Sequence, residues 1–157
     1  MLAYVFFHRP AADVGPGVYE RGLVAFHRSL ETSSASFRLE ALPFGDGGPG
    51  YEDWYLVDDW SALGEIGAVA LAPRRRREHD AVAARSGLGW GGVWALRSGD
   101  PVPPSGVRWE SKPRGRTDDA FLADEGASTV WQRQLVLGPA PEFALAAPPS
   151  PAGVRVA

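Results

Sequence analysis

The stretch Tyr51–Trp60, YEDWYLVDDW, constrains the fold of this chain more than any other part of the sequence. Successive side chains of a β-strand point to opposite faces, and the stretch alternates in that way. One face is then expected to carry Trp54 and Leu56, and the other Tyr51, Asp53 and Tyr55. Which of these faces meets a cavity is left open by the pattern.

The end of the same stretch predicts the start of a helix. Asp58 or Asp59 can accept backbone N–H groups and thereby cap a helix that begins at Trp60. Apolar residues then recur at helical spacing as far as Leu71, and Pro73 ends the pattern. The stretch therefore predicts a strand that leads directly into a helix.

Hydrophobic periodicity predicts similar elements along the first 98 residues. The expected strands are Leu2–His8, Ser36–Leu42, Tyr51–Val57 and Leu88–Leu96. The expected helices are Val18–Thr32, the helix after Asp59, and Arg74–Arg85. Both faces of Leu2–His8 are apolar, so this strand is expected to be central in a sheet that is covered on both sides.

The remaining residues are expected to form an extension of the same domain. A connection rich in Pro and Gly, Gly99–Gly106, separates residues 1–98 from residues 99–147. The extension is expected to contain the strands Val107–Ser111, Thr129–Leu137 and Glu142–Ala146, and a helix Asp118–Asp124 capped by Thr117. Residues 148–157, which include the segment PPSPAG, are expected to be a disordered tail.

The order of elements to Leu96 indicates the fold class. It reads strand, helix, strand, strand, helix pair, strand, which is the ferredoxin-like split βαβ plan of an α+β domain. In this plan the helices cover one face of an antiparallel sheet. The other face must then be covered by a ligand, by the extension or by a second subunit.

The same order over residues 2–96 resembles the dimeric α/β barrel (Dabb-like) family, whose ferredoxin-like domains pair their sheets face to face around a cavity. The resemblance implies a homodimer with a pocket. Because cofactor-free oxygenases, haem-handling enzymes and small-molecule binders share this plan, it implies no single reaction. The long extension after Gly99 departs from the family's plan.

Composition limits the kinds of partner that we expect. A net charge of −3 gives no global attraction to nucleic acid or to an anionic membrane. The basic run Arg74–Arg77 lacks interleaved aromatic residues, so it is interpreted as a solvated helix face. With no cysteine and no membrane-length apolar run, a cytoplasmic location is expected.

Aromatic side chains on the expected strands predict a binding cavity with few polar groups. The candidate ligand-binding residues are Tyr4, Arg38, Trp54, Tyr55, Trp90 and Trp94. Arg38 could instead pair with Glu40 on a solvent-exposed face. His8 and Asp53 are the candidate catalytic residues, although His8 could simply be a hydrogen-bonded histidine at a strand end.

The other histidines carry weaker predictions. His27 lies beside the apolar stripe of the first helix and is interpreted as a buried structural residue. No two histidines have the spacing of a zinc-binding helix, so neither a metal nor a cofactor is expected; haem bound through His79 is the alternative.

Two functions follow from these observations. The first is a sheet-paired dimer that binds a small apolar or aromatic molecule. The alternative is a cofactor-independent monooxygenase or a related small-molecule enzyme, in which His8 or Asp53 removes a proton from the substrate.

Overall fold

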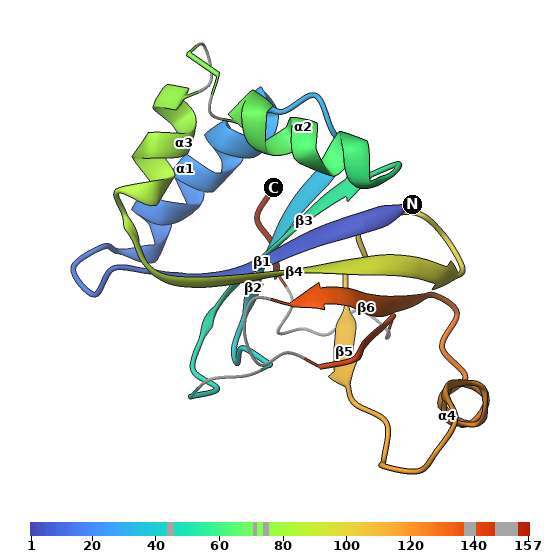
Figure 1. Cartoon of the computed structure of the whole chain (residues 1–157). Helices are drawn as coiled ribbons and strands as arrows, with labels where there is room; N and C mark the ends of the chain where they lie inside the picture. The colour runs from blue at the N-terminus through green and yellow to red at the C-terminus, as the bar shows by residue number, and fades with distance from the viewer. Residues whose placement is uncertain (44–45, 71, 74–75, 137–140, 147–153) are drawn as a thin grey trace.

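The computed structural model describes residues 1–157 except 44–45, 71, 74–75, 137–140 and 147–153. This part of the chain is an α+β protein with a curled antiparallel sheet (Figure 1). The elements are β1 (Leu2–Pro10), α1 (Pro16–Ser29), β2 (Ser34–Leu39), β3 (Gly50–Val57), α2 (Trp60–Ala70), α3 (Arg76–Ala83), β4 (Ser86–Ser98), β5 (Val107–Glu110), α4 (Asp118–Glu125), β6 (Val130–Val136), β7 (Phe143–Ala146) and β8 (Val154–Arg155).

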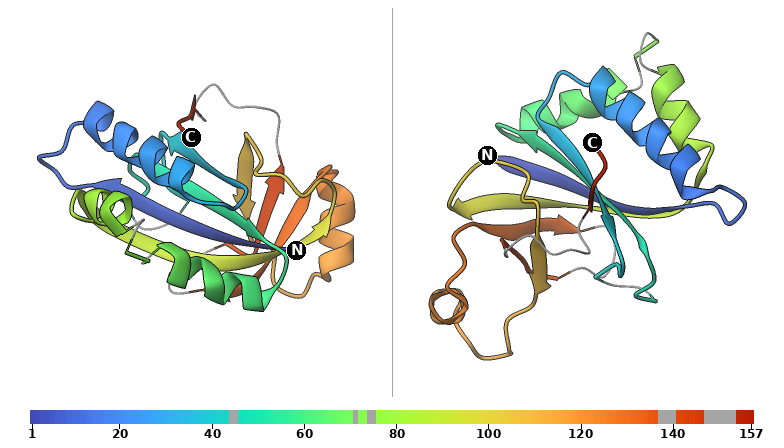
Figure 2. Two further views of the ribbon diagram at one scale, coloured as in Figure 1. Left: turned by 90° about the horizontal axis from the view of Figure 1, so that it is seen from above. Right: turned by 180° about the vertical axis from the view of Figure 1, so that it is seen from behind.

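The strand β1 lies at the centre of the sheet. The order of strands is β5-β7-β6-β4-β1-β3-β2-β8, and neighbouring strands are antiparallel. The register sets Phe6 of β1 between Asp53 of β3 and Gly91 of β4. The prediction of a central first strand is therefore confirmed, and α1, α2 and α3 lie together on one face of β1–β4 (Figures 1 and 2).

The helix α1 forms where apolar residues recur at helical spacing. Tyr19, Leu23 and Phe26 are buried against the sheet, and Pro16 occupies the first turn, where a missing N–H costs nothing. The helix begins two residues before the predicted Val18. It ends at Ser29 because Leu30 is already extended, with φ −83° and ψ 146°.

The opposite face of the sheet is covered by the C-terminal extension. The strand β6 pairs with β4, and β5 and β7 continue the sheet so that it curls back on itself, with β5 below the face that the helices leave free (Figure 1). Trp109 of β5 packs against Phe7, Trp54 and Trp94, with ring centroids 5.0, 5.8 and 5.1 Å apart. The sheet face that the helices leave free is thus covered by the extension, and not by a ligand or a second subunit.

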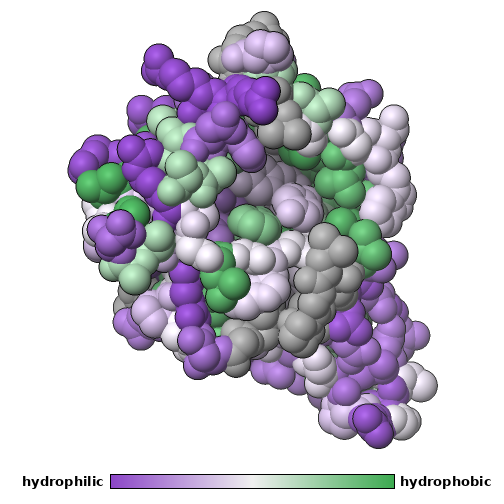
Figure 3. All heavy atoms as spheres, turned by 60° about the vertical axis from the view of Figure 1, so that its left-hand side comes forward, coloured by the Kyte–Doolittle hydropathy of each residue, from purple (hydrophilic) through white to green (hydrophobic). Residues whose placement is uncertain are grey.

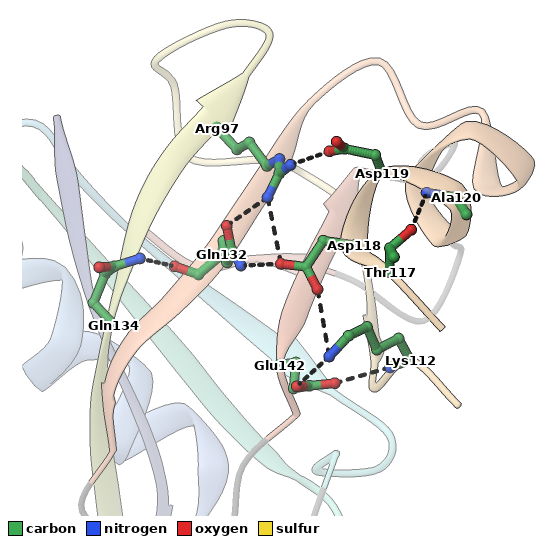
Figure 4. A network of polar contacts seen from close by, with 9 residues as sticks. All are labelled: Arg97, Lys112, Thr117, Asp118, Asp119, Ala120, Gln132, Gln134 and Glu142. Carbon is green, nitrogen blue, oxygen red and sulfur yellow. Dashed lines mark hydrogen bonds and ion pairs between the residues drawn. The ribbon is translucent and has the colours of Figure 1, made fainter. Parts of the chain in front are cut away.

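Polar contacts join α4 to β4 and to the rest of the extension (Figure 4). Arg97 of β4 contacts Asp119 and lies 3.5 Å from Asp118, and Gln132 of β6 donates to Asp118 over 2.7 Å. Lys112 lies 3.3 Å from Asp118. Exposed pairs contribute little singly, but a network that shares Asp118 holds the helix in one place. The predicted cap also forms, since Thr117 accepts from the backbone N–H of Ala120.

The last residues of the chain are predicted to be part of a disordered tail, but two of them form a strand in the structure. Val154–Arg155 form β8, which pairs with β2, because β2 would otherwise present unpaired backbone groups at the sheet edge. The Pro-rich part of that tail, Pro148–Gly153, lies outside the described residues, as do Arg74 and Arg75 of the basic run. The remaining arginines of that run, Arg76 and Arg77, are exposed. In the described part of the chain, no helix has the length and apolar character needed to cross a bilayer.

Candidate functional site

A cavity of about 300 Å³ lies between the helix layer and the face of the sheet that α1, α2 and α3 cover. It is lined by Tyr4, Phe6, His8, Tyr19, Phe26, Leu30, Asp53, Tyr55, Ile66, His79, Val82, Ala83 and Ser86. Seen with the side of α1 and α3 turned forward, the surface is hollowed, and apolar and weakly polar side chains surround the hollow (Figure 3).

Two glycines of β4 allow the aromatic wall of this cavity to form. A Cβ atom at Gly91 would lie 2.4 Å from the hydroxyl of Tyr4, and one at Gly89 would lie 2.3 Å from the ring of Phe6. Side chains cannot approach that closely, so the rings of β1 can lean over β4 only because these positions lack side chains. The wall is therefore built from two strands together.

A buried carboxylate, Asp53, lies at the base of the cavity. Its Oδ2 atom accepts a hydrogen bond of 3.0 Å from the hydroxyl of Tyr55. The same atom lies 3.0 Å from Nε2 of His8 and 3.4 Å from Nε2 of His27. Asp53 is 3% exposed and the two histidines are 1% and 6% exposed, so bulk water screens none of these contacts.

The surroundings of Asp53 decide its protonation. Burial by itself raises the pKa of the carboxyl group, but the close approach of His8 and His27 to Oδ2 outweighs burial and lowers the pKa below its usual range. The group is therefore ionised at neutral pH. Its second oxygen, Oδ1, is buried and has no hydrogen-bond partner among the described residues, which is unusual for a buried carboxylate.

A chain of hydrogen-bonding groups leads from Asp53 to the cavity side of β4. His8 Nδ1 lies 2.7 Å from the hydroxyl of Tyr19, and that hydroxyl lies 2.8 Å from Oγ of Ser86. Ser86 also donates to the carbonyl oxygen of Val82 over 3.1 Å. Tyr19 is fully buried, and burial raises the pKa of its phenol to about 12. Ser86 is partly exposed, so it is the end of the chain that lies closest to solvent.

His27 forms the second side of the Asp53 environment. Its ring stacks on Tyr55, with centroids 5.2 Å apart and planes inclined by 6°. Its Nδ1 atom has no hydrogen-bond partner in the part of the chain that the structure describes. The histidine predicted to be structural is thus buried, as expected, but it lies in direct contact with the carboxylate of the site.

The structure divides the candidate residues into two groups. Tyr4, His8, Asp53 and Tyr55 come together at the cavity. Trp54 and Trp94 are fully buried on the opposite face, where Trp90 packs against the same core. Arg38 belongs to neither group: its half-exposed side chain lies 3.3 Å from Glu20 of α1, not beside Glu40.

Sequence reasoning missed Tyr19 and Ser86 as members of the site. Neither belongs to a motif, and they meet His8 only because α1 and the start of β4 pack over the end of β1. One signal was available for Tyr19. It shares the buried stripe of α1 with His27, and two polar groups on a buried helix face must find polar partners in the sheet below.

His79 lies at the cavity wall, apart from the Asp53 cluster. Its ring is 5.9 Å from that of Phe26, and its Nδ1 is 3.1 Å from a carboxylate oxygen of Asp80. The described residues contain no group of three or more His, Cys, Asp or Glu side chains arranged to hold a metal ion. The haem alternative through His79 stays a prediction.

Comparison of the chain with family models, with curated proteins and with solved structures found no match. The geometry of the site is therefore what indicates the function of this protein.

Proposed function

We propose that this protein binds a small, mostly apolar or aromatic molecule in the cavity between its helices and its sheet. The observation that carries the proposal is the wall of the cavity, which combines aromatic and aliphatic side chains with an ionised carboxylate at its base. Small-molecule sites have this composition, since apolar walls supply affinity and a few polar groups fix orientation.

The charge of the lining favours a neutral ligand over an anion. None of the described lining residues is Lys or Arg, and Asp53 is ionised. An anion taken up from solution would face a fixed negative charge in a medium of low dielectric constant, because it brings no proton that the protein could hold to balance Asp53. A neutral aromatic molecule would instead gain burial against Tyr4, Phe6 and Phe26.

Binding of N-phenyl-1-naphthylamine, a neutral dye that fluoresces in apolar surroundings, tests the proposal. Ala83→Trp places a large side chain at a position that lines the cavity, and Ala84→Trp places the same side chain at the next residue, which does not line it. Both alanines are exposed, so both variants are expected to fold. We expect dye affinity to fall at least about tenfold in Ala83→Trp and to be unchanged in Ala84→Trp. No fluorescence increase with the wild type, or equal losses in both variants, would contradict the proposal.

A second candidate is a cofactor-independent monooxygenase or related enzyme. The contact that favours it is the 3.0 Å approach of His8 to Asp53, because a histidine oriented by a carboxylate is suited to accept a proton. The test is the rate at which dissolved oxygen is consumed in the presence of 1,5-dihydroxynaphthalene, measured with the wild type and with His8→Gln. Uptake no faster than in buffer would count against this candidate.

The strand order β4-β1-β3-β2 supports a further part of the proposal, that β1–β4 and their helices form a ferredoxin-like unit related to dimeric α/β barrels. The homodimer that this resemblance implies would need a different interface from the family's, because the extension covers the free face of the sheet. Light scattering coupled to gel filtration tests it: a mass of one chain would reject the dimer.

A further inference from the structure

The hydrogen-bonded chain of Ser86, Tyr19 and His8 joins a buried ionised acid to the cavity. Its two links measure 2.8 and 2.7 Å, and His8 lies 3.0 Å from Asp53 at the inner end. Binding of an apolar molecule requires no such chain, and polar groups are costly to bury unless they are fully paired. The chain therefore calls for a role beyond packing.

The geometry of the chain is compatible with two directions of hydrogen bonding. When His8 carries its hydrogen on Nε2, its Nδ1 accepts from Tyr19, and Tyr19 accepts from Ser86, whose single hydroxyl proton is then turned away from Val82. When both ring nitrogens carry hydrogen, His8 donates to Tyr19, Tyr19 donates to Ser86, and Ser86 can donate to a group in the cavity or to the carbonyl of Val82. The heavy atoms need not move between the two states.

We propose that the hydrogen-bonded series Ser86, Tyr19 and His8 is a proton relay. It ionises the hydroxyl group of an aromatic or enolic ligand bound beside Ser86. The inference rests on the proposed function, since it requires a ligand in the cavity. The ligand O–H bond breaks and its electron pair stays on the ligand oxygen. The proton passes to Ser86, the Ser86 proton to Tyr19, and the Tyr19 proton to Nδ1 of His8. No oxidant, reductant or other reactant is consumed.

Charge at the inner end favours this transfer. The imidazolium formed at His8 lies 3.0 Å from the ionised Asp53, so a positive charge appears where a negative one already exists. Tyr19 passes a proton without holding a charge, because burial raises its pKa to about 12. The phenolate left in the cavity accepts a hydrogen bond from Ser86.

Other groups surround His8 and must be considered as proton acceptors. From α1, His27 approaches the same Asp53 oxygen at 3.4 Å. From β3, Tyr51 stacks on His8 at 5.6 Å, and its hydroxyl donates to Glu20, outside the relay. On the β4 side His8 faces Gly89, which has no side chain. Among the described residues, the Tyr19 hydroxyl is the hydrogen-bond partner of Nδ1 of His8.

Binding of 4-nitrophenol to the full chain tests the relay, because its phenolate is yellow and its neutral form is not. Equilibrium dialysis is performed at a pH one unit below the pKa of free 4-nitrophenol, where about a tenth is ionised. We expect most of the bound molecules to be phenolate, a shift of at least about one pKa unit, in the wild type. Tyr19→Phe, Ser86→Ala and His8→Gln should each lose this shift. Tyr51→Phe is the matched control, because it removes a hydroxyl beside His8 that is not part of the relay; it should keep the shift.

The neutral analogue 4-nitroanisole separates the relay from binding. It has no acidic proton, so it should bind the wild type and Tyr51→Phe with equal affinity, and measurable binding to Tyr19→Phe shows that this variant still folds around the cavity. If nitroanisole binds but bound nitrophenol stays neutral, or if Tyr19→Phe keeps the phenolate, the relay is wrong and the binding function stands. If His27→Gln abolishes the shift while His8→Gln keeps it, the relay through Tyr19 is also wrong. If neither molecule binds, both proposals fail.

Discussion

The two faces of the central sheet each bury one carboxyl group, but they surround it with different partners. Asp53 and Glu52 are neighbours in β3, and both are almost completely buried. On the helix side, Asp53 meets two histidines and the hydroxyl of Tyr55 at the base of a cavity. On the extension side, Glu52 accepts hydrogen bonds from the indole N–H groups of Trp54 and Trp109, at 3.2 and 3.0 Å, inside a packed tryptophan core.

The difference between the two acids lies in the charge of their partners. Burial raises the pKa of Glu52 to about 7, and the two neutral indole donors offset only part of that rise. Asp53 experiences the same burial, but its histidine partners can carry positive charge and lower its pKa. Asp53 therefore places an ionised carboxylate beside a cavity, where it can act on a bound molecule. Glu52 is about half protonated near neutral pH and holds two tryptophans of the core through hydrogen bonds.

The largest expected contrast concerns packing. Trp54→Ala removes a fully buried ring from the extension-side core and should lower the free energy of unfolding by about 3–5 kcal/mol. Phe6→Ala removes a partly exposed ring from the cavity wall and should cost about 1–2 kcal/mol. Urea unfolding measures both. Equal losses would show that the helix side is packed as tightly as the other face.

The next effect is the pH dependence contributed by Glu52. Its pKa in the folded protein is about 7, above the ordinary value of 4.5, so the folded state binds a proton more tightly than the unfolded state. The free energy of unfolding should therefore fall as pH rises between these values, by about 3 kcal/mol in total. Glu52→Gln should remove this slope, whatever its effect on stability at a single pH. A wild-type curve that is flat between pH 5 and pH 7 would contradict the assignment.

Asp53 should produce a slope of the opposite sign in a separate range. Its pKa is lowered on folding, so its contribution is present above its ordinary pKa and is lost as pH falls through the folded value. We expect the wild type to lose about 2–3 kcal/mol between pH 5 and pH 2 because of this group. Asp53→Asn should remove the slope of the free energy of unfolding below pH 5 (the acid limb) and leave the slope due to Glu52 above it (the Glu52 limb) in place. If both limbs vanish together, the two faces are not independent.

The smallest effect tests how the cavity wall is built. Gly91→Ala should destabilise the protein by about 1–3 kcal/mol, because the new methyl group overlaps the ring of Tyr4. In Tyr4→Ala the same change should cost less, and the difference measures the coupling. Gly64→Ala in α2 is the control: nothing lies within 4 Å of its added Cβ, so it should stabilise the helix by up to about 1 kcal/mol.

Local periodicity was enough to predict the strands and helices of the first 98 residues to within a few positions. The alternation of β3 correctly separated Trp54 from Asp53 and Tyr55, because side-chain direction in a strand depends only on the chain itself. It could not show which face held the cavity. The position of the cavity depends on how far the extension curls, and on the contact of Trp109 with Trp54, 55 positions earlier in the chain.

The candidate site was predictable in part for the same reason. His8 and Asp53 lie on adjacent strands and share a face, so strand pairing brings them together. Tyr19 and Ser86 join them through the docking angle of α1 and the starting point of β4, which no local pattern encodes. Trp90 and Trp94 were assigned to a ligand because aromatic residues suit both a cavity and a core, and sequence alone does not distinguish the two.

The alternation of β3 also decides which mutations this protein can accept over evolutionary time. Insertion or deletion of one residue between Gly50 and Val57 would move every following side chain to the other face of the sheet. Such a change upstream of Glu52 would place its carboxyl group among the histidines and that of Asp53 among the tryptophans. Point substitutions in this strand can be compensated by their neighbours, whereas a change of length without a compensating bulge exchanges both faces at once, so β3 should keep a constant length in any lineage that preserves the cavity.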